Sequence, residues 1–556
     1  MEDELNKVGP IVDEFDCLPG NLQSDGNKVT ARKWITNLTR ISKQCNEKVV
    51  EFTRDIVKYA IKVCGTPPCD FSLATMGSAA KGETTPYSDL EFFILIERSS
   101  VDIVRYFETL SMSMYFLISN LRETNLKYMN IEELRQDGWF EDTCINGFKI
   151  DGLLPNAGNI PTGNGSGTQP KNRFIKTVEE MVKDYVEVFN NPDNERSISG
   201  DLSAMMAFTK HVAGNEVIHK RFRTALDLVS PSKGRLLASA NMLTSDMRKF
   251  DFDFTDDITK LINLKTGIYR YPSLLVHDLK IINRVQASSS WDAIDIMTEK
   301  KLFSKEVSRS FKFALATAQY VRLAAYTHHQ SQVNHISVLK PEKDSLVFPT
   351  PWHFPQQLLT SLVFHLIPLK STLSHALNGV SRLITEVQID EEILVALVCF
   401  YCEDYVKMLD LIGEEKNRWY RTDDSLKDIY LTALLKCARY EDIQQAMAQM
   451  SDESDTNPLA NFCREKTWQA QIFEKKSQFQ QACYCYKEKL QMYSEIFGST
   501  NTHDVALAWE DLAKIQYKAG RLSDSRESVE NSLEIKKPYK ALGKALIVLA
   551  LSVGKR

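Results

Sequence analysis

Glycine and proline are scarce in this sequence. The chain of 556 residues has 23 glycines and 18 prolines, whereas about 12 of every 100 residues belong to these two types in an average protein. Gly and Pro punctuate chains by ending helices and forming turns. Their scarcity therefore favours a largely helical protein, and the length predicts two to four domains rather than a single small module.

Long apolar runs and an excess of one charge are also missing. The longest apolar stretches, near residues 362–369, 393–401 and 545–551, are far shorter than the roughly 18 residues of a membrane span. With 68 basic and 73 acidic side chains, bulk attraction to nucleic acid or anionic lipid is not expected, although a local basic patch remains open. The acidic N-terminus has no signal-peptide pattern, so we expect a cytoplasmic protein without membrane contact.

The cysteines show no disulfide framework. Eleven cysteines lie scattered along the chain without regular spacing, a pattern typical of reduced, buried thiols. One CxxC, Cys399 to Cys402, lies in an apolar run that predicts a helix. We interpret the pair as core thiols, and redox or metal chemistry is the alternative.

The hydrophobic periodicity changes several times along the chain. Residues 31–64 have the 3- and 4-residue spacing of an amphipathic helix or a helix pair, and 101–123 are similar. Short aromatic and β-branched runs at 71–76, 89–96 and 144–154 predict three strands. From about 173 to 331, including DLSAMMAFTKHVAG, the pattern predicts helices almost throughout.

These changes predict an α+β fold with five parts. We expect an N-terminal segment, a small mixed-sheet domain, a helical domain, a proline-rich linker and a helical repeat region, at residues 1–30, 31–170, 171–338, 339–357 and 358–556.

The C-terminal part contains a weak internal repeat. Residues 506–535 resemble the tetratricopeptide (TPR) pattern, with Trp509, the turn glycine Gly520 and small residues at the expected places. The same register occurs 43 residues apart, where Phe479, Ala482, Tyr486 and Leu490 match Leu522, Ser525, Val529 and Leu533. The long period resembles the repeats of kinesin light chains, which implies a groove for a protein partner. An ordinary helical bundle with chance matches is the alternative.

The residues suited to chemistry lie between 77 and 91. Gly77 and Ser78 follow the first predicted strand, and Asp89 and Glu91 lie on the second. Strand alternation places both acids on one face, where they can share a divalent cation that offsets their repulsion. Gly77 allows the backbone to approach a phosphate closely, and Ser78 adds a hydroxyl and an amide.

A third acid, Asp151, lies on the third predicted strand. Three acids on adjacent strands can hold two Mg²⁺ or Mn²⁺ ions, which bind a triphosphate and activate an attacking hydroxyl. The arrangement predicts nucleotidyl transfer. An acid next to Gly152 can also be a simple turn residue, and that alternative stays open for Asp151.

These residues resemble the DNA polymerase β-type nucleotidyltransferase superfamily. The string GSAAKGETTPYSDLEF is similar to the N-terminal domain of protein-PII uridylyltransferase. The resemblance implies that Asp89 and Glu91 bind both metals and that Asp151 binds the catalytic metal and helps to deprotonate the acceptor. It further implies that Gly77 and Ser78 hold phosphates of an NTP (UTP or ATP), with Lys81 as a further phosphate-binding residue, and that a protein hydroxyl bound by the repeats is the acceptor.

The sequence departs from the family pattern at three positions. Ala80 and Lys81 replace a usual Gly and Arg, and Glu91 replaces a second Asp; Lys81 keeps the charge but not the two-pronged guanidinium. The alternative to an enzyme is therefore an interaction scaffold whose nucleotide site is inactive or sensory. A nucleic-acid polymerase would use the same acids, but the near-neutral charge does not favour a basic groove.

Overall fold

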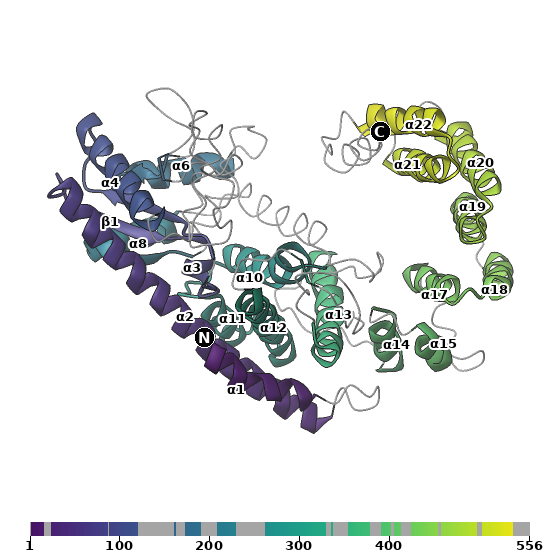
Figure 1. Ribbon diagram of the computed structural model, residues 1–556, viewed down its shortest axis with the longest axis horizontal. Coiled ribbons are helices and arrows are strands. Elements are labelled where there is room, and N and C mark those ends of the chain that lie inside the picture. The colour runs from purple at the N-terminus through teal and green to yellow at the C-terminus, as the bar shows by residue number, and fades with distance from the viewer. Residues whose placement is uncertain are drawn as a thin grey trace. The chain divides into compact units, whose positions relative to one another are not determined.

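The computed structural model defines two compact units, Met1–Glu403 and Asp404–Arg556 (Figure 1). The residues it describes are 2–15, 24–86, 88–119, 161–162, 173–190, 208–229, 262–329, 335–336, 354–378, 391–401, 405–412, 424–453, 458–497 and 503–536. Helices dominate the described residues, and the first unit also contains a small mixed sheet. This confirms the predicted α+β class.

Four strands form the central sheet. Their order is β3–β2–β1–β4, with bounds Ile175–Lys176, Phe92–Ile96, Phe71–Thr75 and Lys210–Gly214. β1 pairs antiparallel with both β2 and β4, and β2 pairs parallel with β3. The predicted strand 71–76 is confirmed closely. The predicted strand 89–96 begins later as regular β2, with Asp89 and Glu91 just before it.

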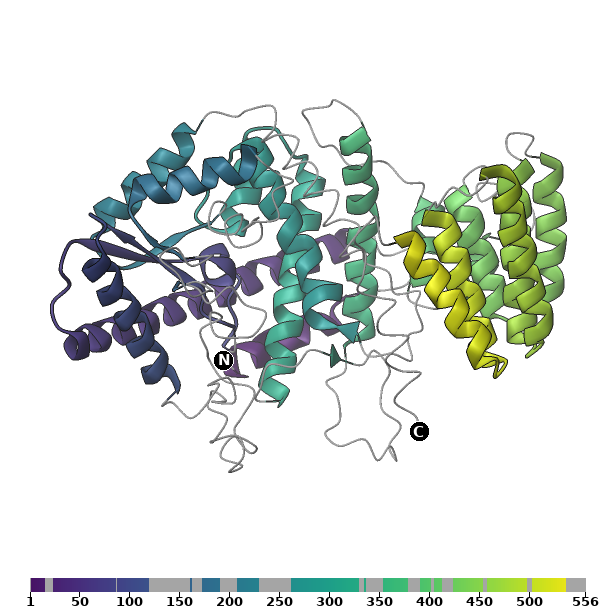
Figure 2. The ribbon, with the colours of Figure 1, turned by 90° about the horizontal axis from the view of Figure 1, so that it is seen from above.

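Helices cover both faces of this sheet (Figure 2). Along β2, Phe92, Ile94 and Ile96 pack against helices α2 (Asp25–Cys64) and α4 (Val101–Ser119). Phe93 and Leu95 alternate to the other face, against α6 (Val178–Asn190) and α8 (Glu216–Leu228). Every residue of β2 is buried, because a strand covered on both faces has no solvent side.

One continuous helix, α2, joins the sheet to the rest of the first unit. Its 40 residues begin after the cap Ser24, whose hydroxyl accepts from the Asn27 N–H, and span roughly 60 Å at 1.5 Å per residue. The C-terminal half packs on the sheet. In the N-terminal half, the Trp34 indole N–H donates to the Thr317 hydroxyl of α12 across 3.2 Å.

The other helices of the first unit pack beside the sheet layer. They are α1 (Glu2–Asp13), α3 (Gly77–Lys81), the π-helix η4 (Leu264–Tyr269), α10 (Arg270–Asn283), α11 (Ser290–Glu299), α12 (Lys305–His329), α13 (Gln356–Asn378) and α14 (Glu391–Tyr401). Strands β5 (Ile262–Asn263) and β6 (His335–Ile336) form a separate antiparallel pair. α12 contacts α2, α10, α11 and α13, and most of its residues are buried.

The prediction of a helix over DLSAMMAFTKHVAG is wrong for the last five residues of this segment. The structure places the edge strand β4 at Lys210–Gly214, where pairing with β1 overrides local helix preference. Gly214 ends the strand at a φ of 84°, and a Cβ there would lie 2.2 Å from the Phe71 carbonyl oxygen. The described parts of segment 173–229, which the pattern assigned to the helical domain, thus contribute β3, α6, β4 and α8 to the sheet layer.

Several predicted features lie outside the described residues. They include the strand at 144–154 with Asp151, most of the linker at 339–357, and Cys402. Cys399 is a buried cysteine in α14. No helix in the described ranges has both the length and the apolar character needed to cross a bilayer.

The second unit contains helical hairpins in a row (Figure 1). After α15 (Tyr405–Ile412), the hairpins are α17 (Asp424–Lys436) with α18 (Tyr440–Glu453), α19 (Pro458–Lys475) with α20 (Phe479–Phe497), and α21 (His503–Lys518) with α22 (Leu522–Lys536). The helices of each hairpin contact each other, and α20 also packs on α21. The core between the last two hairpins includes Ala482, Tyr486, Leu512 and Ile515.

The three hairpins share one turn geometry. Ala438, Ser477 and Gly520 each have a φ between 56° and 76°, the left-handed region in which glycine is favoured. In each turn, the N–H of the next residue donates to the carbonyl oxygen of the residue five positions earlier. The pairs are Arg439 to Leu434, Gln478 to Phe473 and Arg521 to Gln516. This is the Schellman arrangement of a helix end, repeated at spacings of 39 and 43 residues.

This shared geometry predicts opposite effects for glycine and alanine at equivalent turns. Ser477→Gly is expected to raise the free energy of unfolding by about 0.5 kcal/mol or more, because a Cβ costs about 1–2 kcal/mol in the left-handed region. Gly520→Ala is expected to lower it by about 1 kcal/mol for the same reason. Urea denaturation of the full chain, followed by circular dichroism, measures both changes.

The matched control is Ala446→Gly, in the interior of α18. There glycine is expected to cost about 1 kcal/mol because the backbone is right-handed and helical. If Ser477→Gly destabilises as much as Ala446→Gly does, the left-handed turn at Ser477 is refuted.

A buried histidine on α8 predicts a pH-dependent stability. Burial, and then the neighbouring Arg223, lower the pKa of His219 to about 4, and its Nε2 lies 2.9 Å from the Thr209 hydroxyl. The unfolded chain, with a histidine pKa near 6.5, binds the proton first, so stability is expected to fall as pH drops from about 6.5 to 4, by at most about 3 kcal/mol. Unfolding titrations across this range should show a shallower slope for His219→Gln, and equal slopes would contradict the assignment.

Candidate functional site

The candidate site lies where β1 ends and the chain approaches β2. The Met76 N–H donates to the Glu91 carbonyl oxygen across 3.0 Å, so pairing between the two strands continues beyond their regular bounds. Gly77 then begins the short helix α3 with a φ of 61°. The start of α3 and the acid Glu91 are therefore neighbours in space, although 14 residues separate them.

Gly77 and Glu91 touch directly. A Cβ built on Gly77 would lie 1.3 Å from Glu91 Oε2 and 2.5 Å from Glu91 Cδ. The carboxylate thus occupies the space that any other side chain at position 77 would fill. This close approach is a physical reason for glycine at this position, in addition to its positive φ.

Asp89 and Glu91 continue the alternation of β2. Leu90, between them, is buried in the α2–α4 core with Phe92, so the two acids turn toward the opposite side of the strand. Both acids are half-buried. The structure therefore brings Gly77 and Glu91 together and places Asp89 on the same side of the strand as Glu91.

Ser78 and Lys81 lie on the same short helix, α3. The Ser78 hydroxyl is 3.4 Å from that of Thr84, and the Ser78 carbonyl accepts from the Glu83 N–H across 2.9 Å. Lys81 is only 6% exposed, and its Nζ lies 3.4 Å from the Ser273 hydroxyl of α10. A lysine at this position thus reaches toward the helical layer.

Asp151 lies outside the described residues, so the structure does not place the third predicted acid. The described residues contain no group of three or more His, Cys, Asp or Glu side chains suited to one metal ion. Asp89 and Glu91 are therefore a pair of oxygen donors in this part of the chain. Carboxylate oxygens are the ligands that Mg²⁺ and Mn²⁺ prefer, so the pair fits such an ion in donor type.

The loop between α3 and Asp89 carries polar contacts that the sequence did not predict. Glu83 is fully buried, and its Oε2 accepts from the Tyr269 hydroxyl at 2.7 Å and the Ser273 hydroxyl at 2.6 Å. Burial, and then Glu83, raise the pKa of Tyr269. The Tyr269 hydroxyl therefore keeps its proton and donates to the carboxylate.

Two side chains of α12 hold the same loop by its backbone and hydroxyls. Gln319 Nε2 and Arg322 Nη1 both donate to the Glu83 carbonyl oxygen, at 3.0 and 3.3 Å. Arg322 Nη2 contacts the Ser88 hydroxyl at 3.2 Å and the Thr85 hydroxyl at 3.5 Å. These partners lie 186 to 239 residues from the loop, and no local pattern in the sequence reports such pairs.

The family described as "Putative nucleotidyltransferase DUF294" matches residues 27–122. This range holds α2, β1, α3, β2 and α4, and with them Gly77, Ser78, Lys81, Asp89 and Glu91. The N-terminal part of the chain is therefore a nucleotidyltransferase-type domain. The search of curated proteins gave no match.

The contact between Gly77 and Glu91 predicts a specific stability pattern. Gly77→Ala is expected to lower the free energy of unfolding by more than the roughly 1–2 kcal/mol of the left-handed backbone alone, because the new methyl group also displaces the Glu91 carboxylate. In a Glu91→Ala background the steric part disappears and only the backbone part remains. Denaturation of the two single variants and the double variant measures the difference.

Gly9→Ala is the control for this substitution. A Cβ at Gly9, in α1, has no heavy atom within 4 Å, and alanine there is expected to stabilise by up to about 1 kcal/mol. An equal cost of Gly77→Ala with and without Glu91 would show that the two residues do not touch.

Proposed function

We propose that this protein transfers a nucleoside monophosphate from an NTP to a hydroxyl acceptor. The observation that carries the proposal is the packing of the Glu91 carboxylate against Gly77, beside Asp89, at the end of β1. This contact supports a site in which Glu91 lies next to the turn that we expect to bind phosphate, with Asp89 two residues earlier on the same side of the strand. The match of residues 27–122 to a nucleotidyltransferase family supports the same kind of reaction.

In this proposal Asp89 and Glu91 hold two Mg²⁺ or Mn²⁺ ions, with Asp151 as a further ligand. When bound, ions of this kind neutralise the triphosphate and the departing pyrophosphate. Gly77 and Ser78 bind the β- and γ-phosphates through backbone approach and a hydroxyl. Lys81 adds a positive charge on the same short helix, although its Nζ is within reach of Ser273.

The reaction exchanges one phosphorus–oxygen bond for another. The acceptor oxygen bonds to the α-phosphorus, the bond from this phosphorus to the bridging oxygen breaks, and pyrophosphate leaves with the electron pair. Asp151 takes the proton of the acceptor hydroxyl. Because phosphoryl transfer needs no covalent bond to the protein, positioning of the reactants supplies most of the rate.

The similarity of GSAAKGETTPYSDLEF to protein-PII uridylyltransferase supports UTP or ATP as the nucleotide and a protein as the acceptor. We place the acceptor on the C-terminal hairpins, which we interpret as TPR-like repeats. The three equivalent left-handed turns at Ala438, Ser477 and Gly520 support repetition of one hairpin unit. Repeats of this type form a concave surface for a protein partner.

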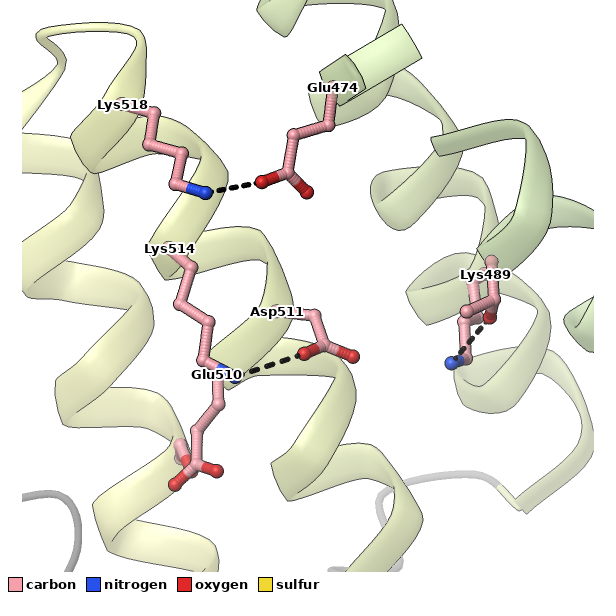
Figure 3. Close-up of polar contacts among 8 residues, drawn as sticks. Glu474, Lys489, Glu510, Asp511, Lys514 and Lys518 are labelled. Atoms are coloured by element: carbon pink, nitrogen blue, oxygen red, sulfur yellow. Dashed lines mark hydrogen bonds and ion pairs between the residues drawn. The ribbon is translucent and has the colours of Figure 1, made fainter. Parts of the chain in front are cut away.

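Contacts between the hairpins support regular stacking of their first helices (Figure 3). Lys518, at the end of α21, pairs with Glu474, at the corresponding end of α19. Lys489 donates to Thr467 within one hairpin, and 43 residues later Ser532 donates to Glu510 within the next. The two hairpins thus repeat their inner polar contact as well as their turn.

An interaction scaffold with an inactive or sensory nucleotide site is the second candidate function. The observation that favours it is the burial of Lys81 beside Ser273, since this lysine replaces the usual arginine of the family pattern. A scaffold binds its partner through the repeats and releases no pyrophosphate. We propose a cytoplasmic location for either function, with no role for nucleic acid or membrane.

The proposal predicts that nucleotide transfer depends on Asp89 and Glu91. The purified chain, incubated with each α-labelled NTP, Mg²⁺ or Mn²⁺ and cell lysate, is expected to label a protein band and release pyrophosphate. Asp89→Asn and Glu91→Gln are each expected to reduce both signals at least about 100-fold, because an amide replaces a charged ligand. Circular dichroism confirms that the variants fold.

Glu97→Gln is the matched control, because Glu97 is an exposed acid just beyond the opposite end of β2. It should retain full activity. Consumption of no NTP by the unmutated chain would contradict the enzyme and favour the scaffold. Equal activity of all variants would remove Asp89 and Glu91 from the site.

A further inference from the structure

The loop at residues 82–88, between α3 and Asp89, is buried except at Pro86 among its described residues. Its backbone and side chains are polar, and buried polar groups need partners. Inside the loop, the Thr85 N–H donates to the Ser88 hydroxyl and the Ser88 N–H donates to the Thr85 carbonyl. Ser78 of α3 contacts the Thr84 hydroxyl and the Glu83 N–H, and further partners come from η4, α10 and α12.

A single arginine contacts the loop at three points. Arg322 of α12 reaches the Glu83 carbonyl through Nη1, and the Thr85 and Ser88 hydroxyls through Nη2. Its guanidinium lies 4.0 Å from the centre of the Tyr269 ring, a distance typical of a cation–π contact. Arg322 is 3% exposed, so water does not compete strongly for these contacts.

The Glu83 side chain supplies a second attachment. Its carboxylate accepts from Tyr269 of η4 and from Ser273 of α10, and Ser273 also contacts Lys81. A buried carboxylate is costly without donors, so Glu83 fixes the loop to these two helices. The last anchored residue, Ser88, is the immediate neighbour of Asp89.

We infer that Arg322, Tyr269 and Glu83 are positioning residues for the nucleotidyl-transfer site. They form a latch, defined by these three side chains with Ser273, that fixes the loop between the phosphate-binding turn and the metal-binding acids. The inference rests on the proposed function. It adds that the segment matched by the nucleotidyltransferase family does not set the position of Asp89 by itself, because the latch includes residues of η4, α10 and α12 beyond that segment.

The latch holds the loop at Glu83, Thr85 and Ser88, so its loss should affect the placement of Asp89 more than nucleotide binding. Misplacement of a reacting group by about 1 Å can reduce a rate about 100-fold. Removing the Tyr269 hydroxyl leaves the ring beneath Arg322. Replacing Arg322 with lysine keeps the charge but loses the fork that contacts three points.

The test uses the full chain and measures pyrophosphate release against NTP and Mg²⁺ concentrations. Tyr269→Phe and Arg322→Lys are expected to lower kcat about 10- to 100-fold and to raise the Mg²⁺ concentration for half-maximal rate, while KM for the NTP changes less than about threefold. Glu83→Ala combined with Tyr269→Phe is expected to lose no more than Glu83→Ala alone, because each change removes the hydrogen bond between the two side chains.

Thr317→Val is the matched control. Thr317 lies on α12 and is fully buried like Arg322, but its hydroxyl accepts from Trp34 of α2 rather than contacting the loop. It should lower the melting temperature without changing kcat or the Mg²⁺ requirement.

The outcomes separate the two hypotheses. If the unmutated chain releases no pyrophosphate, the proposed function fails and the positioning role fails with it. If the unmutated chain is active but Tyr269→Phe and Arg322→Lys behave like Thr317→Val, losing only melting temperature, the latch is structural and this inference alone is overturned. Additive losses in the Glu83 and Tyr269 pair would also overturn it.

Discussion

The buried loop at residues 82–88, which carries Glu83, constrains how the sheet layer and the helical layer of the first unit pack together. Glu83 has no exposed surface, and a buried carboxylate needs hydrogen-bond donors; its Oε2 accepts from two hydroxyls, whereas its Oε1 has no partner among the described residues. Those donors come from η4 and α10, and the loop carbonyl is held by α12. The sheet layer and the helical layer therefore meet through directional hydrogen bonds, which fix register in a way that apolar packing alone does not.

Helix α2 also joins the sheet layer to the helical layer. Its last turns belong to the core beneath the sheet, whereas Trp34, near its start, packs on Tyr320 and donates to Thr317 of α12. A helix of 40 residues without an internal Gly or Pro after its first turn is stiff. The stiff helix α2 therefore sets the spacing between α12 and the sheet. The buried loop lies between these same two layers and contacts α12.

The candidate site was predictable from the sequence where its geometry is local. Gly77, Asp89 and Glu91 lie within 15 residues, just after β1 and just before β2, so strand period and a turn glycine were enough to place Gly77 beside Glu91. Arg322 and Tyr269 were not predictable, because their partners are about 190 to 240 residues away and neither residue belongs to a spaced motif. β4 was missed for a related reason: five residues of mixed pattern become a strand only when β1 offers an edge.

The three helical hairpins of the second unit show that a spacing in the structure can be clearer than its signal in the sequence. All three hairpins need a residue with positive φ after the first helix, yet glycine occupies this position only in the last one, while serine and alanine occupy it in the others. The cost of a Cβ there is about 1–2 kcal/mol, small enough for the paired hydrogen bonds of the turn and the helix packing to offset. A search for turn glycines therefore finds one copy, whereas the described helices of the second unit contain three such turns. The polar contact inside the hairpin also keeps its place while its residues differ. Lys489 donates to Thr467 in one hairpin and Ser532 donates to Glu510 in the next, because these two positions require a donor and an acceptor rather than particular residues.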